Sequence, residues 1–517
     1  MIGGRSAEPL GEFCLVLHTH LPWLARHGSW PVGEEWLYQA WADSYLPLIE
    51  LLEHLAAEGL RDQLALGVTP VLAAQLDDPY SLRGLHDWLG DRVLRTRHAA
   101  VRWQQGRPEL RALAAAEHRR AVDALGLFET RWRHGASPLL RPLVDSGVIE
   151  LLGGPATHPF QPLLHPRLRA EALRVGLADG ELRRGSRGTG IWAPECGFDP
   201  GMELGYADAG VTHFLVDSPA LAGRTSAARP VWDSEVVCFG RDGEIAERVW
   251  SPKVGYPGHP AYRDFHTYDH PTGLKPARVT GRTVAPEDKQ PYLPDVAAAA
   301  VAEHVADFVD AVVTRLREHR DAADTARPPL VVAAFDTELF GHWWHEGPAW
   351  LAGVLRGLPE AGVTVTTPRR VLAAGHVGAP VELPASSWGS GKDWRVWNGP
   401  AVADLVADND RLQHRLLAVV DGHRFGAGRD RVLDQLWQEA LLACSSDWAF
   451  MVTRDSAADY ARARAAEHTA AFDRLADLVE AGDRAEAEAA ATRLRVVDGP
   501  FGALDARGLL RGRGASH

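Results

Sequence analysis

The sequence predicts an α/β barrel, because short apolar runs alternate along the chain with segments of helical periodicity, and because polar residues follow those runs. The clearest run is 330–335, Leu-Val-Val-Ala-Ala-Phe, which is long enough for a strand buried on both faces. Asp336 and Glu338 come directly after it. The carboxyl ends of parallel strands share one rim where ligands bind, so we expect functional residues at the ends of these runs.

Further apolar runs fit the same arrangement. We expect strands over residues 13–17, 64–70, 148–152, 189–195, 211–217 and 363–366. Helical periodicity predicts helices over 34–58, 166–184 and 294–320. The pattern is weaker between 217 and 330, where we identify no further strand.

Long helical stretches divide the chain into domains. We assign 1–80 and 146–399 to the barrel and 81–145 to a helical insert, which is too long for a single crossover helix. Such an insert can act as a lid or shape a groove, or it can be padding. We assign 400–497 to a helical C-terminal domain, and we expect 498–517, which has few apolar residues, to be disordered.

The composition of the chain excludes some classes of binding partner and favours others. The chain has 517 residues and a formal net charge of −13, which disfavours nucleic acid and anionic membranes as partners. The four cysteines have no metal-finger or redox spacing, and the start of the chain lacks the apolar core of a signal peptide. We therefore expect a cytoplasmic protein. The 18 tryptophans hint at carbohydrate binding.

Two carboxylates, Glu195 and Asp336, each follow a predicted strand and could meet on one rim. A retaining glycosidase needs two carboxyl groups about 5 to 5.5 Å apart, one as nucleophile and one as acid and then base. The acid needs a raised pKa, which an apolar wall such as Trp343 could supply by excluding water. The alternative is that Asp336 caps the next helix.

Histidines are also expected at the strand ends. His18 and His20 would point to the same side of an extended segment, because side chains alternate along a strand. His158 follows a third strand, in a loop rich in glycine and proline. Such a cluster can grip ligand hydroxyls or hold a metal ion.

Five segments in series carry recognisable motifs. They are 18–22 (HTHLP), 153–158 (GGPATH), 192–195 (WAPE), 334–341 (AFDTELFG) and 386–389 (SSWG). Through these motifs the chain resembles glycoside hydrolase family 57, and within it the 1,4-α-glucan branching enzymes. The resemblance spans most of the chain.

The resemblance implies an incomplete (β/α)7 barrel with a helical insert and a helical C-terminal domain. It also implies that Glu195 is the nucleophile and Asp336 the general acid/base, with no cofactor and no metal. Donor and acceptor would both be α-1,4-glucan, and the product an α-1,6 branch. The substrate-binding residues we expect, from the motifs and from the aromatic segments, are His18, His20, Trp30, His158, Tyr256, Trp343, Trp388, Trp397 and Asp447. Tyr256 would lie on a mobile GYPG loop, and Trp388 and Trp397 on an exposed aromatic surface.

Three alternatives stay open from the sequence. The chain could be an α-amylase or a 4-α-glucanotransferase of the same family. His18, His20, His158 and Asp336 could instead bind Zn²⁺ in a metal-dependent deacetylase or mannosidase. Finally, the protein could bind α-glucan without catalysis. The oligomeric state, monomer or dimer, is not predicted.

Overall fold

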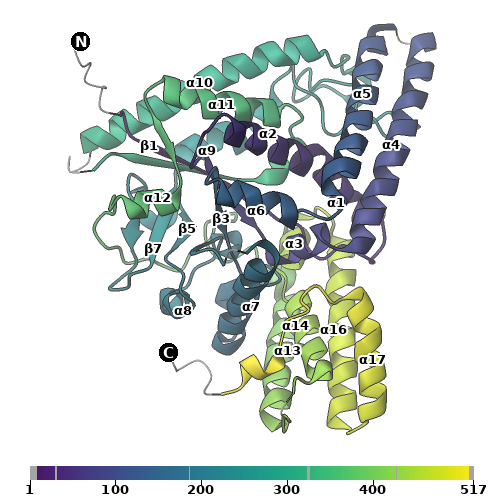
Figure 1. Cartoon of the computed structure of the whole chain (residues 1–517), viewed down its shortest axis with the longest axis vertical. Helices are drawn as coiled ribbons and strands as arrows, with labels where there is room; N and C mark the ends of the chain where they lie inside the picture. The colour runs from purple at the N-terminus through teal and green to yellow at the C-terminus, as the bar shows by residue number, and fades with distance from the viewer. Residues whose placement is uncertain are drawn as a thin grey trace.

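The computed structural model describes residues 9–29, 32–106, 108–185, 187–322, 327–426 and 428–511. Trp30, one of the predicted substrate-binding residues, lies outside these ranges. Figure 1 shows a central barrel, a long helical hairpin labelled α4 and α5 beside it, and a bundle of C-terminal helices below that hairpin.

Seven parallel strands in the described part of the chain form the barrel. They are β1 (Glu12–Thr19), β2 (Leu64–Val68), β3 (Ile149–Leu152), β4 (Gly190–Ile191), β5 (His213–Asp217), β7 (Val237–Arg241) and β8 (Leu330–Asp336). They pair in the orders β3-β2-β1-β8 and β4-β5-β7. At one seam Gly153 bridges to Ile191, and at the other the Asp242 amide donates to the Val332 carbonyl at 2.8 Å. The two sheets therefore close into a ring, which confirms the predicted barrel.

One barrel strand, β7, was not predicted. It lies between 217 and 330, where the apolar pattern was judged too weak, and a short antiparallel strand β6 (Arg229–Pro230) pairs with it. The run Val237-Cys238-Phe239 is followed by Gly240, where a Cβ atom would lie 2.5 Å from the Leu221 side chain. The glycine is needed for this close packing, and it makes the sequence of the strand look interrupted. β9 (Thr364–Thr366), which was predicted, pairs with the first residues of β1.

Helices surround the barrel. They include α1 (Glu34–Ala40), α2 (Leu46–Ala57), α3 (Pro70–Leu76), α7 (Pro166–Arg184), α8 (Met202–Asp208), α9 (Gly243–Trp250), α10 (Pro294–Ala322), α11 (Gly347–Glu360) and α12 (Pro368–Ala373). A five-residue π-helical segment, Trp41–Tyr45, joins α1 to α2. The single helix predicted over 34–58 is thus continuous but carries one wide turn.

The helical insert is a hairpin of α4 (Pro79–Gly106) and α5 (Arg111–Leu127), which pack along each other. The next helix, α6 (Ser137–Asp145), instead contacts α2, α7 and β3. We therefore place the end of the insert before Ser137 rather than at residue 145, because α6 covers the barrel.

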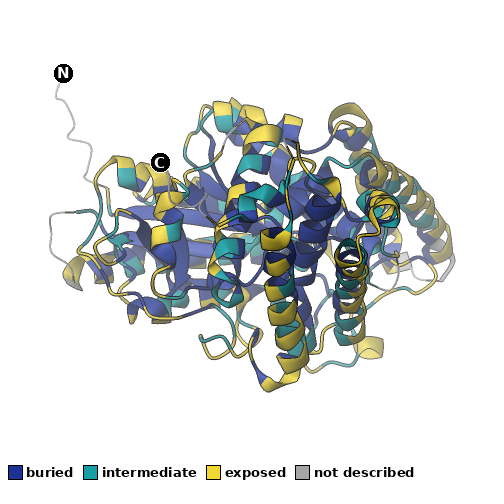
Figure 2. Cartoon of the chain, turned by 90° about the horizontal axis from the view of Figure 1, so that it is seen from below, coloured by how far each residue is buried: buried dark blue, intermediate teal, exposed yellow. Residues whose placement is uncertain are grey.

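The C-terminal domain is helical, as expected. It contains α13 (Ala403–Gly422), α14 (Arg431–Ala443), α15 (Ser446–Arg454), α16 (Ala458–Glu480) and α17 (Arg484–Val497). Residues 432–443 of α14 are all buried, so α14 is the central helix of the domain. Its apolar cluster includes Trp23 and Ala156 from the barrel loops, and Figure 2 shows buried residues continuing through the interior of the molecule. The domain and the barrel thus share part of one core.

The prediction that 498–517 is disordered is wrong for residues 498–511. Phe501, Leu504 and Leu509 are buried in the C-terminal apolar cluster, and a 3-10 turn covers Ala506–Leu509. The segment has few apolar side chains, but each of these is inserted between helices that come from elsewhere in the chain. Residues 512–517 lie outside the described residues. Among the described helices, none is long and apolar enough to span a membrane.

Candidate active site

The Glu195 backbone is held in an uncommon conformation on the rim of the barrel. Glu195 follows β4 and has φ 62° and ψ 18°, the left-handed region that costs a residue with a Cβ roughly 1 to 3 kcal/mol. Its carbonyl accepts from the Trp388 amide at 2.9 Å, and Phe198 bridges to Ser386 nearby. Pairing with the 386–388 segment therefore fixes a strained backbone at the strand end.

Both oxygens of the Glu195 carboxyl accept hydrogen bonds. Ser446 Oγ donates to Oε1 at 2.8 Å, and the Trp388 indole donates to Oε2 at 2.8 Å. The residue is only 8% exposed. Burial raises the pKa of the Glu195 carboxyl to about 7, although both hydrogen bonds act to lower it.

Asp336, the last residue of β8, lies in register with His18 of β1. It is partly exposed, and no hydrogen bond to its carboxyl oxygens occurs among the described residues. Burial raises the pKa of Asp336 to about 7, and the negative charge of Glu195 adds to that rise. The two carboxyls predicted from the sequence thus lie close enough for the charge of Glu195 to act on Asp336.

A third carboxyl, Glu338, comes two residues after Asp336. It is 2% exposed, and its Oε1 accepts from the Tyr45 hydroxyl at 2.5 Å and from the His20 amide at 3.2 Å. Burial and the charge of Asp336 raise the pKa of Glu338 to about 8. Glu338 is therefore mostly protonated at neutral pH.

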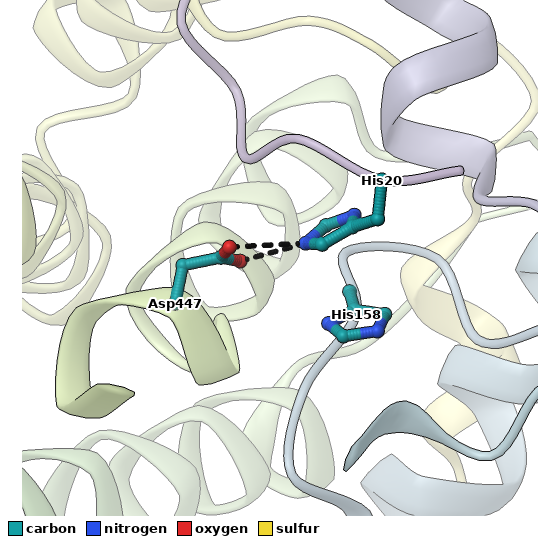
Figure 3. Close-up of side chains that lie close together, drawn as sticks. All are labelled: His20, His158 and Asp447. Atoms are coloured by element: carbon teal, nitrogen blue, oxygen red, sulfur yellow. Dashed lines mark hydrogen bonds and ion pairs between the residues drawn. The ribbon is translucent and has the colours of Figure 1, made fainter. Parts of the chain in front are cut away.

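The predicted histidines come together in one stack. His18 and His20 lie on the same side, with ring centres 5.7 Å apart, and the His20 and His158 rings are 3.7 Å apart. Figure 3 shows His20, His158 and Asp447 converging from three separate segments, with His20 pointing at the Asp447 carboxylate. His20 Nε2 is 2.9 Å from Asp447 Oδ2, and His20 Nδ1 is 3.0 Å from Thr69 Oγ1.

The charges in this stack are set by burial and by pairing. Burial holds the pKa of His18 and of His158 well below its usual value, so both rings are neutral. Burial alone would raise the pKa of Asp447, yet the neighbouring His20 lowers it, so Asp447 is a carboxylate. Ser445 Oγ also donates to Asp447 at 2.6 Å.

The donor set of this cluster differs from the zinc site considered from the sequence. His20, His158 and Asp447 each have a possible ligand atom within 4.8 Å of the others, whereas Asp336 is not part of the group. His20 uses both ring nitrogens in contacts with Asp447 and Thr69. A metal ion would have to break these contacts.

Other functional candidates were missed by the sequence analysis. Arg241, at the end of β7, lies 5.3 Å from the Trp388 ring and pairs with Asp217 at 3.0 Å. Its positive charge acts to lower the pKa of Asp336. A correctly predicted β7 would have placed Arg241 on the rim. Ser446 had no signal beyond its position next to Asp447.

Two of the side chains predicted to bind substrate, Tyr256 and Trp397, are buried. Tyr256 is 7% exposed, stacks on His304 with ring centres 4.4 Å apart, and donates to Asp307. Its loop is therefore anchored to α10. Trp397 is 1% exposed and stacks on Phe160 at 4.6 Å, so the prediction that it forms an exposed surface is wrong.

The remaining predicted aromatics are more accessible. Trp388 contacts Glu195 and the His18 and Trp192 rings. Trp343 is half-buried, 6.0 Å from the exposed Trp250, and lines a pocket between the insert and the barrel.

Comparison with known proteins gives matches over the whole fold. The family model described as glycosyl hydrolase family 57 matches residues 14–379, and the model of the C-terminal region of 1,4-alpha-glucan branching enzymes matches residues 410–508. A probable 1,4-alpha-glucan branching enzyme of Mycobacterium tuberculosis is 57% identical over 523 residues, covering 98% of this chain and 99% of that protein.

Two solved structures are similar to this chain over nearly its whole length. The GH57-type branching enzyme of Pyrococcus horikoshii superposes with a TM-score of 0.91 at 30% identity, covering 98% of both chains. The alpha-amylase AmyC of Thermotoga maritima superposes with a TM-score of 0.86 at 26% identity, covering 96% of this chain and 99% of that one.

Proposed function

Because this chain belongs to glycoside hydrolase family 57 and matches its branching enzymes along nearly its whole length, we propose that Glu195 and Asp336 carry out a branching reaction on α-1,4-glucan. The activity is that of a 1,4-α-glucan branching enzyme: it acts on α-glucan and transfers chains to form branches. The assignment of individual residues is our proposal.

The observation that carries this assignment is the asymmetry of the two carboxyls. Glu195 accepts two hydrogen bonds, which favour its ionised form. Asp336 accepts no such hydrogen bonds from the described residues. The negative charge of Glu195 also raises the pKa of Asp336, which favours the protonated form of Asp336. The pKa of each carboxyl is about 7, and we propose from the two hydrogen bonds to Glu195 that the pair shares one proton near neutral pH and that this proton resides on Asp336.

This protonation state fits the first step of a retaining mechanism. Glu195 attacks C1 of an α-1,4-linked glucosyl unit, while Asp336 gives its proton to the departing O4 of the chain. The products are a covalent glycosyl ester on Glu195 and an ionised Asp336. Once Glu195 is an ester it carries no charge, so the pKa of Asp336 falls and Asp336 can serve as a base.

In the second step Asp336 takes the proton from the 6-hydroxyl of an acceptor glucan. The alkoxide oxygen attacks C1, the ester bond to Glu195 breaks, and an α-1,6 link forms. Water competes with the acceptor for the intermediate. We assign the exclusion of water to the apolar side chains around the pair, with Trp388 foremost.

The other rim side chains would bind the reacting sugar. We propose that Asp447 and the stacked histidines face its hydroxyls, although His20 and His158 already have protein partners. Trp343, with Trp250 beside it, offers an indole face to a sugar ring further along the glucan.

Chain-length analysis of amylose treated with the purified protein tests this function. A branching enzyme yields a product that isoamylase cuts into short linear chains, whereas untreated amylose is unchanged by isoamylase. The structural match to an α-amylase makes hydrolysis the second candidate. That candidate predicts a steady rise in reducing ends with no chains released by isoamylase, which would contradict the proposed transfer.

A further inference from the structure

We propose that Ser446 is the positioning residue of the nucleophile: its hydroxyl holds the Glu195 carboxylate and is itself held by a chain of neutral histidines, His158 and then His18. The proposal rests on the role of Glu195 given above. It adds a residue from the C-terminal domain to the reaction, together with a second use for the two histidines besides any contact with sugar.

The chain consists of three consecutive short contacts. Ser446 Oγ lies 2.8 Å from Glu195 Oε1 and 2.9 Å from His158 Nδ1. His158 Nε2 lies 3.0 Å from His18 Nε2. All four residues are buried, with exposed fractions of 8% or less. Bulk water therefore does not compete for these contacts.

One proton assignment satisfies the whole chain when Glu195 is ionised. A carboxylate only accepts, so the single hydroxyl hydrogen of Ser446 is donated to it. Ser446 Oγ then accepts from His158 Nδ1–H, which leaves His158 Nε2 as an acceptor for His18 Nε2–H. His18 Nδ1 is left as a bare acceptor, and it has no hydrogen-bond partner among the described residues. Each neutral ring is thus restricted to one tautomer.

Protonation of Glu195 on Oε1, the oxygen that Ser446 contacts, would reverse the direction of every bond in the chain. The carboxylic acid would donate to Ser446, Ser446 to His158, and His158 to His18, which would leave a buried N–H on His18 without a partner. Hydrogen bonds to an ionised carboxylate are about twice as strong as those between neutral groups. The chain therefore favours the ionised nucleophile in a fixed orientation.

The fold places Ser446 through backbone contacts with the His158 loop. The Ser446 amide donates to the His158 carbonyl at 3.0 Å, and Pro159 bridges to Ser445 in antiparallel fashion. Thr157 Oγ1 also donates to the Leu441 carbonyl at 2.6 Å. The loop after β3 and the start of α15 are thus joined as one unit, so the hydroxyl position does not depend on the side chain alone.

Several other groups face Glu195. Asp336 comes from β8, Asp447 from α15, and the Trp388 indole from the 386–389 segment, while His158 Nδ1 lies 3.9 Å from Oε1. The charge of Asp447 raises the pKa of Glu195, whereas Ser446 and Trp388 lower it. Replacing Ser446 by alanine leaves these other groups in place. A shift in the acid limb of the pH–activity profile therefore measures the effect of the Ser446 hydroxyl on the pKa of Glu195.

Steady-state kinetics on amylose with three variants tests the proposal. Ser446→Ala removes the donor, Ser446→Thr keeps a hydroxyl, and Ser456→Ala removes an exposed hydroxyl from the same domain as a matched control. We expect S446A to lower kcat by about 10- to 100-fold with little change in KM, because a hydrogen bond to a charged group is lost. We also expect the acid limb of kcat/KM to move up by roughly one pH unit. S446T should keep most of the activity and the original limb, and S456A should match the unsubstituted protein.

The proposal would be overturned by a folded S446A protein whose kcat is within about twofold of the original and whose acid limb of kcat/KM is not shifted. A folded S446T protein as impaired as S446A would also overturn it. Glu195→Ala separates this outcome from failure of the proposed function. If E195A is inactive while S446A is normal, Glu195 keeps its role and only the Ser446 inference falls. If E195A still branches amylose, the assignment of the nucleophile falls first.

A measurement on the unsubstituted protein covers the case in which the variants do not fold. Histidine-selective ¹⁵N NMR above pH 7 reports the tautomer of each neutral ring, and loss of a signal in His158→Asn identifies His158. We expect the proton of His158 on Nδ1 and that of His18 on Nε2. The opposite tautomer at His158 contradicts the chain.

Discussion

The two carboxyls of the site lie in contrasting surroundings. Glu195 is fixed by a strained backbone and by a hydrogen bond to each oxygen. Asp336 ends a regular strand, is partly exposed, and has no such bonds among the described residues. A nucleophile benefits from a fixed position and a stable charge, whereas an acid/base must pass a proton in both directions. The difference between the two surroundings therefore mirrors the difference between the two proposed roles.

The largest effect should come from removing the nucleophile. We expect Glu195→Ala to lower branching by on the order of 10⁴-fold or more, because the carboxylate proposed to form the covalent intermediate is lost. Azide should restore part of the bond cleavage by occupying the space of the lost carboxylate, and should give a glycosyl azide that mass spectrometry detects. Because azide replaces the nucleophile in a single displacement, the product of Glu195→Ala should be the inverted β-glycosyl azide; if Asp336→Ala gave the β-azide and Glu195→Ala the α-azide, the two roles would be reversed.

We expect Asp336→Asn to lower the rate of branching of amylose by about 10²- to 10⁴-fold, because the proton donor to the departing chain is lost. The loss in the first step should be much smaller with an α-maltosyl fluoride donor, since fluoride leaves without a proton, so the glycosyl-enzyme should accumulate. Rapid quench followed by mass spectrometry of the Glu195 peptide measures this. Equal losses with both donors would argue against a role for Asp336 as acid.

The same substitution should stabilise the fold. The pKa of Asp336 in the folded protein, about 7, lies above its unfolded value of about 3.9. The ionised carboxyl therefore weakens folding increasingly as the pH rises from 4 through 7. We expect Asp336→Asn to raise Tm at pH 8 and to leave it nearly unchanged at pH 4, as followed by calorimetry.

Trp388→Phe tests the second bond to the nucleophile. It removes the donor to Glu195 Oε2 but keeps an aromatic ring next to Trp192 and Arg241. We expect kcat to fall about 10- to 100-fold, and the acid limb of kcat/KM to rise. Trp232→Phe, at an exposed tryptophan, is the matched control. A change in KM alone would show that Trp388 serves binding only.

The pH profile should be narrow. Glu195 must be ionised and Asp336 protonated, and the pKa of each is raised to about 7. Activity then follows the singly protonated pair and should fall about tenfold per pH unit on either side of an optimum near neutrality. A plateau extending from pH 5 to 9 would contradict the coupling between the two groups.

The smallest effect is expected at the third carboxyl. Because Glu338 is mostly protonated at pH 7, Glu338→Gln replaces one neutral group by another that can still accept from Tyr45 and His20. We expect less than about threefold change in kcat at pH 7. A loss above 100-fold in a folded protein would mean that ionised Glu338 takes part in the reaction.

The parts of the site that follow local rules could be predicted from the sequence. Strand periodicity located β8 with Asp336 and β1 with His18. The strand predicted over 189–195 led to Glu195, although β4 covers only Gly190–Ile191 and Glu195 lies in a 3-10 turn. Each of these predictions needs only the neighbouring residues. The same reasoning failed at β7, where a glycine demanded by packing interrupts the pattern.

Contacts between residues that are distant in the sequence were missed for a different reason. Tyr256 and Trp397 look like exposed aromatics in loops rich in glycine, but His304 and Phe160 cover them. Ser446 lies 251 positions from the carboxylate it touches. The local sequence does not predict such contacts, because they form only when elements that are distant in the chain pack together.

The π-helical segment Trp41–Tyr45 has a consequence for how this site tolerates changes in chain length. A π-turn contains one residue more than the α-helical turn it replaces, and each residue of an α-helix advances the chain by about 100°. Deleting one residue here would restore a regular helix, but it would rotate α1 relative to α2 and turn Tyr45 away from Glu338. Substitutions should thus be accepted along this helix far more readily than a one-residue deletion, which would separate the phenol from Glu338 without touching either of them.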